Sequence, residues 1–116
     1  MKREIIIYGS HFADFYNQQE IRVKRKIDYV IDLVRNVERV PIKFLKYLEG
    51  SDALYEIRVS TFIKEIRILC FFDDDKIIVL LNSFTKKSQK TPRQEIEIGE
   101  KLKFEYFKNK NTEKIK

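Results

Sequence analysis

The sequence predicts an α+β fold with an N-terminal strand, a two-helix hairpin, an antiparallel meander sheet and a C-terminal helix. Apolar residues recur at steps of three and four between Val23 and Val37, as on one face of a helix. From Leu54 to Phe72 they alternate with polar residues instead, as in half-buried strands. Only three Gly and two Pro interrupt 116 residues, which favours a single domain, residues 1–116, of long regular elements.

The N-terminal third is expected to form one strand and two helices. Residues Arg3–Tyr8 are rich in β-branched side chains, and Gly9 ends them, with Ser10 as the N-cap of the helix that follows. A break near residues 17–20 splits the helical stretch in two before Pro41 ends it. A solvated helix face is expected to carry the basic residues Lys24, Arg25, Lys26 and Arg35.

The rest of the chain is predicted to form the meander and the last helix. The three strands are Leu54–Val59, Glu65–Phe72 and Lys76–Leu81, after a connector, Ile42–Leu48. The last strand is apolar on both faces, so it is expected inside the sheet and covered on both sides. Pro92 suits the first turn of a helix from Arg93 to about Asn109, and residues from about 110 to 116 are expected to form a frayed basic tail.

Charge and composition limit the function. Lys and Arg number 24 against 18 Asp and Glu, and the net charge of +6 indicates a polyanionic partner or an acidic protein. Cys70 and His11 are each the only residue of their type, which leaves neither a disulfide nor a zinc site, and nothing indicates a cofactor. No apolar run reaches the roughly 20 residues of a membrane span, nor the core of a signal peptide, so we expect a cytoplasmic protein.

The register of the first hairpin of the meander places two arginines face to face. If this hairpin turns at Phe62-Ile63, aliphatic residues oppose each other on a buried face, and Arg58 opposes Arg67 on the polar face. Two guanidinium groups in this position repel each other. Either an anion sits between them, or Glu56 and Glu65 neutralise them at the surface.

A basic segment, residues 83–93, follows the last predicted strand. It carries four basic residues and no acidic one, and composition alone also fits a solvated loop. Because it begins at the end of the interior strand, Lys86 and Lys87 come toward the part of the sheet that presents the two arginines. The segment also supplies the hydroxyl groups of Ser83, Thr85 and Thr91. Arginine forks, lysine charges and hydroxyl groups are the donors of a phosphate site.

Four stretches of the sequence are similar to motifs of a known protein family. They are Glu56-Ile57-Arg58, Arg67-Ile68 with Phe71-Phe72, Leu80 to Pro92, and Glu95 to Ile98, and they cover about the C-terminal half. This set resembles the phage-derived HigB branch of the RelE/ParE toxin superfamily. The most specific stretch is Phe-x-Lys-Lys-x-x-Lys-x-Pro, from Phe84 to Pro92, between an apolar strand and a helix. The predicted order of elements also fits the RelE/ParE-like fold.

The resemblance implies the toxin of a type II toxin–antitoxin system that acts as an mRNA interferase. Such a protein is a ribosome-dependent, metal-independent endoribonuclease that leaves 2′,3′-cyclic phosphate ends and inhibits translation. The implied partners are the ribosome, mRNA and a cognate antitoxin, a helix-turn-helix protein encoded next to the toxin, and no membrane is involved.

The chemistry needs a base for the 2′-hydroxyl, positive charge for the phosphorane and an acid for the leaving 5′-oxygen. We expect Arg58 and Arg67 to hold the phosphate. Lys86 or Lys87 is expected to act as base or acid, because crowded cations lower the pKa of a lysine. The expected RNA-binding residues are Lys90, Arg93, Ser83, Thr85 and Tyr47, the last by stacking on a base.

Two other functions fit the same fold. A ParE-like protein inhibits DNA gyrase by binding it, without catalysis. Such proteins usually lack a basic cluster after the last strand, so Lys86-Lys87 argues against this alternative. A nucleic-acid-binding domain without enzyme activity is also compatible with the basic charge.

Overall fold

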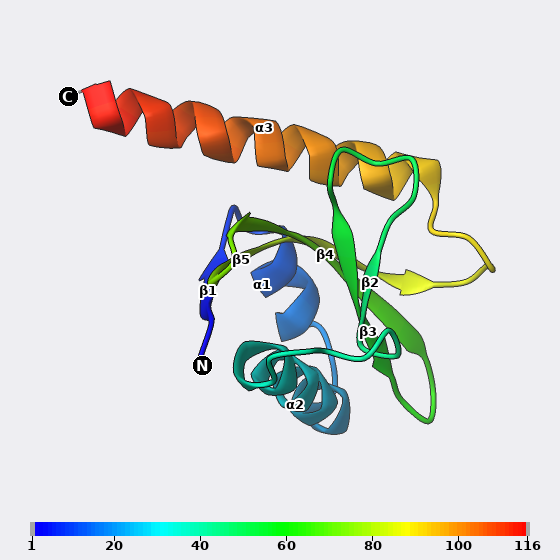
Figure 1. Ribbon diagram of the computed structural model, residues 1–116. Helices are drawn as coiled ribbons and strands as arrows, with labels where there is room; N and C mark the ends of the chain where they lie inside the picture. The colour runs from blue at the N-terminus through cyan, green and yellow to red at the C-terminus, as the bar shows by residue number, and fades with distance from the viewer. Residues whose placement is uncertain (1, 116) are drawn as a thin grey trace.

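A computed structural model describes residues 2–115, with side chains through residue 111, and confirms the α+β fold. The elements are β1 (Glu4–Ile7), α1 (His11–Asn17), α2 (Ile21–Asn36), β2 (Leu45–Tyr47), β3 (Tyr55–Ser60), β4 (Glu65–Asp74), β5 (Ile77–Lys86) and α3 (Arg93–Ile115). One mixed sheet has the strand order β1-β5-β4-β3-β2, with β1 parallel to β5. Figure 1 shows three layers, with α1 and α2 on one face of the sheet and α3 across the other. Within the described range, no helix combines the length and the apolarity needed to span a bilayer.

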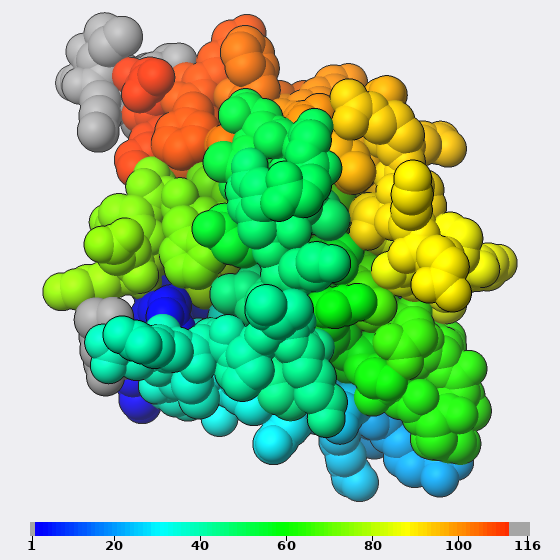
Figure 2. Space-filling model, turned by 45° about the vertical axis from the view of Figure 1, so that its right-hand side comes forward, coloured from blue at the N-terminus to red at the C-terminus, as the bar shows by residue number. Residues whose placement is uncertain are grey.

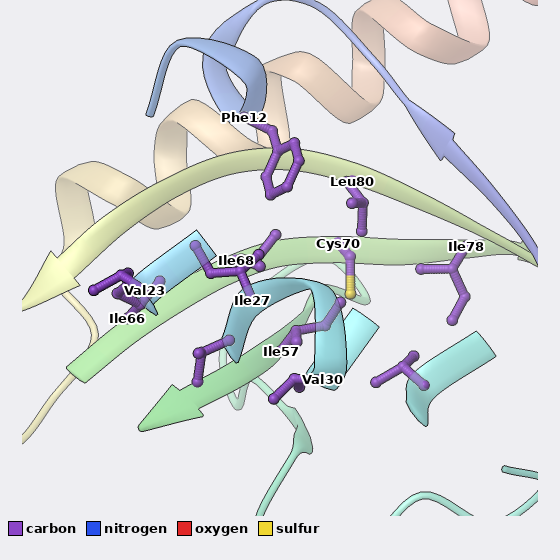
Figure 3. Packing of buried hydrophobic residues seen from close by; sticks show 12 residues of the cluster. Phe12, Val23, Ile27, Val30, Ile57, Ile66, Ile68, Cys70, Ile78 and Leu80 are labelled. Atoms are coloured by element: carbon purple, nitrogen blue, oxygen red, sulfur yellow. The ribbon is translucent and has the colours of Figure 1, made fainter. Parts of the chain in front are cut away.

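The sheet face toward α1 and α2 is aliphatic. Its buried side chains come from both helices and from β3, β4 and β5, and Figure 3 shows Ile57 and Ile68 of the sheet close to Ile27 and Val30 of α2. Each fully buried side chain of this size contributes about 1.5–3 kcal/mol. Because a shift of one residue would turn these side chains outward, their burial fixes which residues of β3 and β4 face α3.

The opposite face is covered only in part. Val79 and Leu81 of β5 pack there with Ile96 and Leu102 of α3, while Ile78 and Leu80 face the other helices. This confirms that β5 lies inside the sheet with both faces covered. Gly99 allows α3 to pack closely, because a Cβ there would lie 3.1 Å from a side-chain oxygen of Asn82 and from Leu54.

The N-terminal helices follow the prediction at their start and break, and differ at their end. Ser10 is the N-cap of α1, although its side chain makes no capping hydrogen bond, and residues 18–20 separate α1 from α2. The helix α2 ends at Asn36, before Pro41, with Val37 in an extended conformation. The Arg3 guanidinium donates hydrogen bonds to the carbonyls of Val34, at 2.8 Å, and of residues 37 and 38. These carbonyls thus have a donor where the backbone N–H groups of a further helical turn are missing.

Three predicted boundaries were wrong. The connector 42–48 contains the edge strand β2, whose three residues are too few to show a period. The strand β5 continues past Leu81 to Lys86, because Phe84 is buried against α3 and keeps the chain extended. The helix α3 continues past Asn109 to Ile115, so residues 110–115 are helical rather than frayed, and Lys116 lies outside the described residues. No Gly or Pro after Gly99 interrupts this helix.

Candidate functional site

The hairpin of β3 and β4 brings Arg58 and Arg67 together as predicted. The two residues are direct cross-strand partners in the observed register. They lie on the α3 face, beyond the part of the sheet that α3 covers, because the neighbouring residues Ile57 and Ile68 are buried on the other face. The side chain of Arg58 is 28% exposed and that of Arg67 only 6%, so Arg67 is more buried than a polar sheet face predicts.

One buried carboxylate lies against both arginines. Oε2 of Glu56, whose side chain is 3% exposed, lies 3.5 Å from Nε of Arg58 and 3.7 Å from Nε of Arg67. These separations are those of ion pairs rather than of close hydrogen bonds, and the buried Nε of Arg67 has no hydrogen-bond partner in the described part of the chain. Glu56 therefore neutralises part of the arginine charge, one of the two alternatives that the sequence left open, and it does so from a buried position rather than at the surface.

Glu65 contacts the same cluster from its solvent side. Its carboxylate lies 3.2 Å from Nη1 of Arg67 and accepts a hydrogen bond from the hydroxyl of Ser60. The Ser60 hydrogen bond and the Arg67 charge hold the pKa of Glu65 below its ordinary value. Because Glu65 is half exposed, this pair is screened by water and contributes little to stability.

A concavity of about 550 Å³ collects all four residues predicted to be catalytic. Arg58 and Arg67 line it from the sheet, Lys86 from the end of β5 and Lys87 from the loop that follows. With Glu56 and Glu65, four cations face two carboxylates, so the cluster keeps a net charge of +2. The concavity therefore attracts anions.

Lys86 is the lysine of this cluster whose protonation the surroundings disfavour. Partial burial lowers the pKa of Lys86, and the charges of Arg67, Arg58 and Lys46 lower it further, while Glu56 opposes them. A larger fraction of the Lys86 side chain is therefore neutral near pH 8 than for an ordinary lysine. A neutral amine beside two guanidinium groups can accept a proton.

A second groove, of about 710 Å³, adjoins the concavity. Both are lined by Arg58, Lys86, Ser88 and Gln89, and the groove continues past Lys46, Tyr47, Lys90, Thr91 and Arg93. Figure 2 shows the loop of residues 87–92, called the basic loop below, in yellow between the green β3–β4 hairpin and the orange start of α3. Three of the predicted RNA-binding residues, Tyr47, Lys90 and Arg93, thus border one continuous depression. Tyr47 pairs with Tyr55, and its ring packs edge to face on that of Tyr55, which belongs to the sheet face toward α2. The predicted stacking ring thus lies on the other face from Glu56 and Arg58.

The other two predicted RNA-binding residues lie elsewhere. Ser83 pairs with Ile68 and Thr85 with Ile66, so both residues belong to the sheet face that packs against α1 and α2. Neither residue lines the concavity or the groove. The cause is the extension of β5, which makes alternate residues of the segment 83–86 face opposite sides.

Lys46 was not singled out from the sequence, and Thr91 was singled out only as a hydroxyl group, without its contact to Glu56. Lys46 is opposite Glu56 in the β2–β3 register, and the short β2 gave no sign that this pairing exists. The Thr91 hydroxyl donates a hydrogen bond of 2.7 Å to Oε1 of Glu56, across 35 residues of sequence. Only the loop that returns Thr91 to β3 reveals this contact, although the two-residue spacing of Glu56 and Arg58 places both on one strand face.

The chain matches one family model. The model described as phage derived protein Gp49-like (DUF891) matches residues 14–103. This range includes α2, the β2–β5 sheet and every residue of the concavity. No curated protein matches the chain. Among the described residues, no group of three His, Cys, Asp or Glu side chains could hold a metal ion.

Proposed function

The chain belongs to the Gp49-like family of phage-derived proteins, a family associated with RelE/HigB-like toxins, and we propose that it is the toxin of a type II toxin–antitoxin pair that cleaves messenger RNA on the ribosome. The observation that carries this proposal is the pair of cross-strand arginines, which lies beside Lys86 and Lys87. The nearby carboxylates neutralise only part of the positive charge of these four residues. Such a cluster suits a phosphodiester, whose negative charge increases in the transition state of cleavage.

The arginines hold the scissile phosphate in this proposal. A guanidinium presents two donors to two phosphate oxygens, and Arg58 and Arg67 approach from neighbouring strands. Their positions are set by the sheet before substrate binds, so little reorganisation accompanies the reaction.

The two lysines supply the proton transfers. Lys86, whose pKa is lowered, takes the proton of the 2′-hydroxyl as its oxygen attacks the phosphorus. Lys87, exposed in the basic loop, gives a proton to the departing 5′-oxygen. The products are a 2′,3′-cyclic phosphate and a 5′-hydroxyl, and neither a metal ion nor a cofactor takes part.

The groove carries the neighbouring nucleotides. Lys90 and Arg93 attract the backbone beyond the scissile phosphate. The ribosome supplies the orientation that this sparse set of residues lacks, since holding two reacting groups in place lowers a barrier by several kcal/mol.

Induced expression followed by primer extension tests the proposal. We expect growth arrest, and translated messages cut at defined positions while untranslated RNA of the same sequence stays intact. Equal cleavage of naked RNA would remove the ribosome from the proposal. Intact messages together with inhibited supercoiling by DNA gyrase would replace it with the ParE-like function.

A further inference from the structure

Glu56 occupies the middle of the proposed site without a role in the chemistry. Its side chain is 3% exposed, and both of its oxygens are engaged by different parts of the chain. Oε2 lies against the two arginines of β3 and β4, and Oε1 accepts the hydrogen bond from Thr91. A buried carboxylate with partners from three separate segments constrains all three segments at once.

We propose that Glu56 is a positioning residue that joins the phosphate-holding arginines to the basic loop through its contacts with Arg58, Arg67 and Thr91. This inference rests on the proposed function, because it assigns Glu56 to the same site. Glu56 keeps the two guanidinium groups at a fixed separation despite their repulsion. Through Thr91 it holds the end of the basic loop, and with it Lys87 and Lys90, over the sheet.

The geometry favours positioning over proton transfer by Glu56. Both ion pairs run from Nε of an arginine, the nitrogen nearest the aliphatic stem, so the carboxylate supports the guanidinium groups from their base. Thr91 covers the other oxygen at 2.7 Å. Thr91 lies two residues before Arg93, where α3 begins, so its hydrogen bond to Glu56 ties the loop to β3 close to the start of the helix.

Two substitutions at residue 91 separate this role from a general structural one. Thr91→Val keeps the side-chain shape and removes the donor, whereas Thr91→Ser keeps the donor. We expect Thr91→Val to lower the single-turnover rate on programmed ribosomes about tenfold at saturating enzyme, because a small displacement of the basic loop misplaces Lys87. Thr91→Ser should restore the rate, and the melting temperatures of both variants should match. A wild-type rate in Thr91→Val would overturn the link to the basic loop.

A second measurement needs no cleavage. In the free protein, ¹⁵N NMR of the arginine Nε–H groups should show the resonances of Arg58 and Arg67 shifted by Glu56→Gln, while the exposed Arg25 serves as an internal reference. Unchanged resonances of Arg58 and Arg67 would show that Glu56 does not hold them. If the wild-type protein cleaves nothing, the proposed function fails, and these resonances still decide the role of Glu56. Should Glu56→Gln not fold, the Thr91→Val and Thr91→Ser spectra make the same comparison.

Discussion

Arg58 and Arg67 are direct cross-strand partners, and a single carboxylate oxygen of Glu56 lies within 3.7 Å of Nε of both. Like charges in this position destabilise a hairpin unless an anion compensates them. Glu56 and, at the solvent side, Glu65 compensate only part of the positive charge of the cluster, which is carried by Arg58, Arg67, Lys86 and Lys87. The site is thus built to receive a further negative charge, which is what the proposed reaction on a phosphodiester provides.

Replacing the two arginines should separate activity from stability. Arg58→Ala and Arg67→Ala are both expected to abolish growth arrest, because loss of one such donor typically lowers a rate by about a hundredfold or more. Arg58→Ala should leave the melting temperature nearly unchanged. Arg67→Ala should cost about 1–3 kcal/mol, because it removes a buried partner of Glu56. Growth assays and thermal melts measure both effects.

Two controls accompany these variants. Arg25→Ala removes the same charge from an exposed position of α2 and should leave toxicity and stability as in the wild type. Arg58→Lys should rescue poorly, since an ammonium group cannot reproduce the fork. If both Arg58→Ala and Arg67→Ala stay toxic, the two arginines form only a structural ion-pair network and do not hold the phosphate.

The pH dependence of cleavage follows from the lowered pKa of Lys86. A lysine that accepts a proton must be neutral, and its neutral fraction rises steeply with pH below its pKa and levels off above it. The pKa of Lys86 lies below the ordinary 10.5. The single-turnover rate on ribosomes should therefore rise with pH between about 7 and 9, close to tenfold per unit while most Lys86 is still charged. Lys86→Met should remove most of the rate together with this slope, and Lys87→Met should keep the slope. A rate that falls as pH rises would assign Lys86 to the acid.

An antitoxin should mask the cationic cluster. The net charge of +6 and the exposed Lys87, Lys90 and Arg93 favour an acidic partner segment. Co-expression with the product of the neighbouring gene, the expected antitoxin, should yield a complex whose affinity falls with added salt, and in which the resonances of Lys87 or Lys90 shift. Recovery of free, non-toxic protein alone from that co-expression would argue against this partner.

The end of α2 should depend on Arg3. Its guanidinium donates to three backbone carbonyls there, so Arg3→Met should lower the free energy of unfolding by about 1–3 kcal/mol. Arg35→Met makes the same chemical change at an exposed position of the last turn and should cost a few tenths of a kcal/mol. Urea unfolding of both variants compares them, and equal losses would show that the Arg3 contacts add nothing.

The sequence predicted the sheet register because the aliphatic residues of β3 and β4 leave one register in which they share a face. Ile57 and Ile68 oppose each other as expected, and this alone places Arg58 opposite Arg67. The interior position of β5 was predicted because its residues are apolar on both faces, and strong apolar patterns survive tertiary packing.

What the sequence could not predict depends on contacts between distant segments. The edge strand β2 forms by pairing with β3. Its residues Lys46 and Tyr47 line the groove, so the groove depends on this pairing. The faces of Ser83 and Thr85 could not be predicted from a strand that ended at Leu81. Pairing of residues 83–86 with β4 and the burial of Phe84 continue β5 to Lys86. The link from Thr91 to Glu56 depends on where the loop returns, and no local pattern encodes it.

Single-turnover cleavage of a defined message on purified programmed ribosomes tests the central claim most directly. The wild-type protein and Arg25→Ala should cut the message in the ribosomal A site and leave 2′,3′-cyclic phosphate ends, whereas Arg58→Ala, folded by its melting curve, should be slower by about a hundredfold or more. Cleavage by Arg58→Ala at the wild-type rate, or an intact message with folded wild-type protein, would contradict the account.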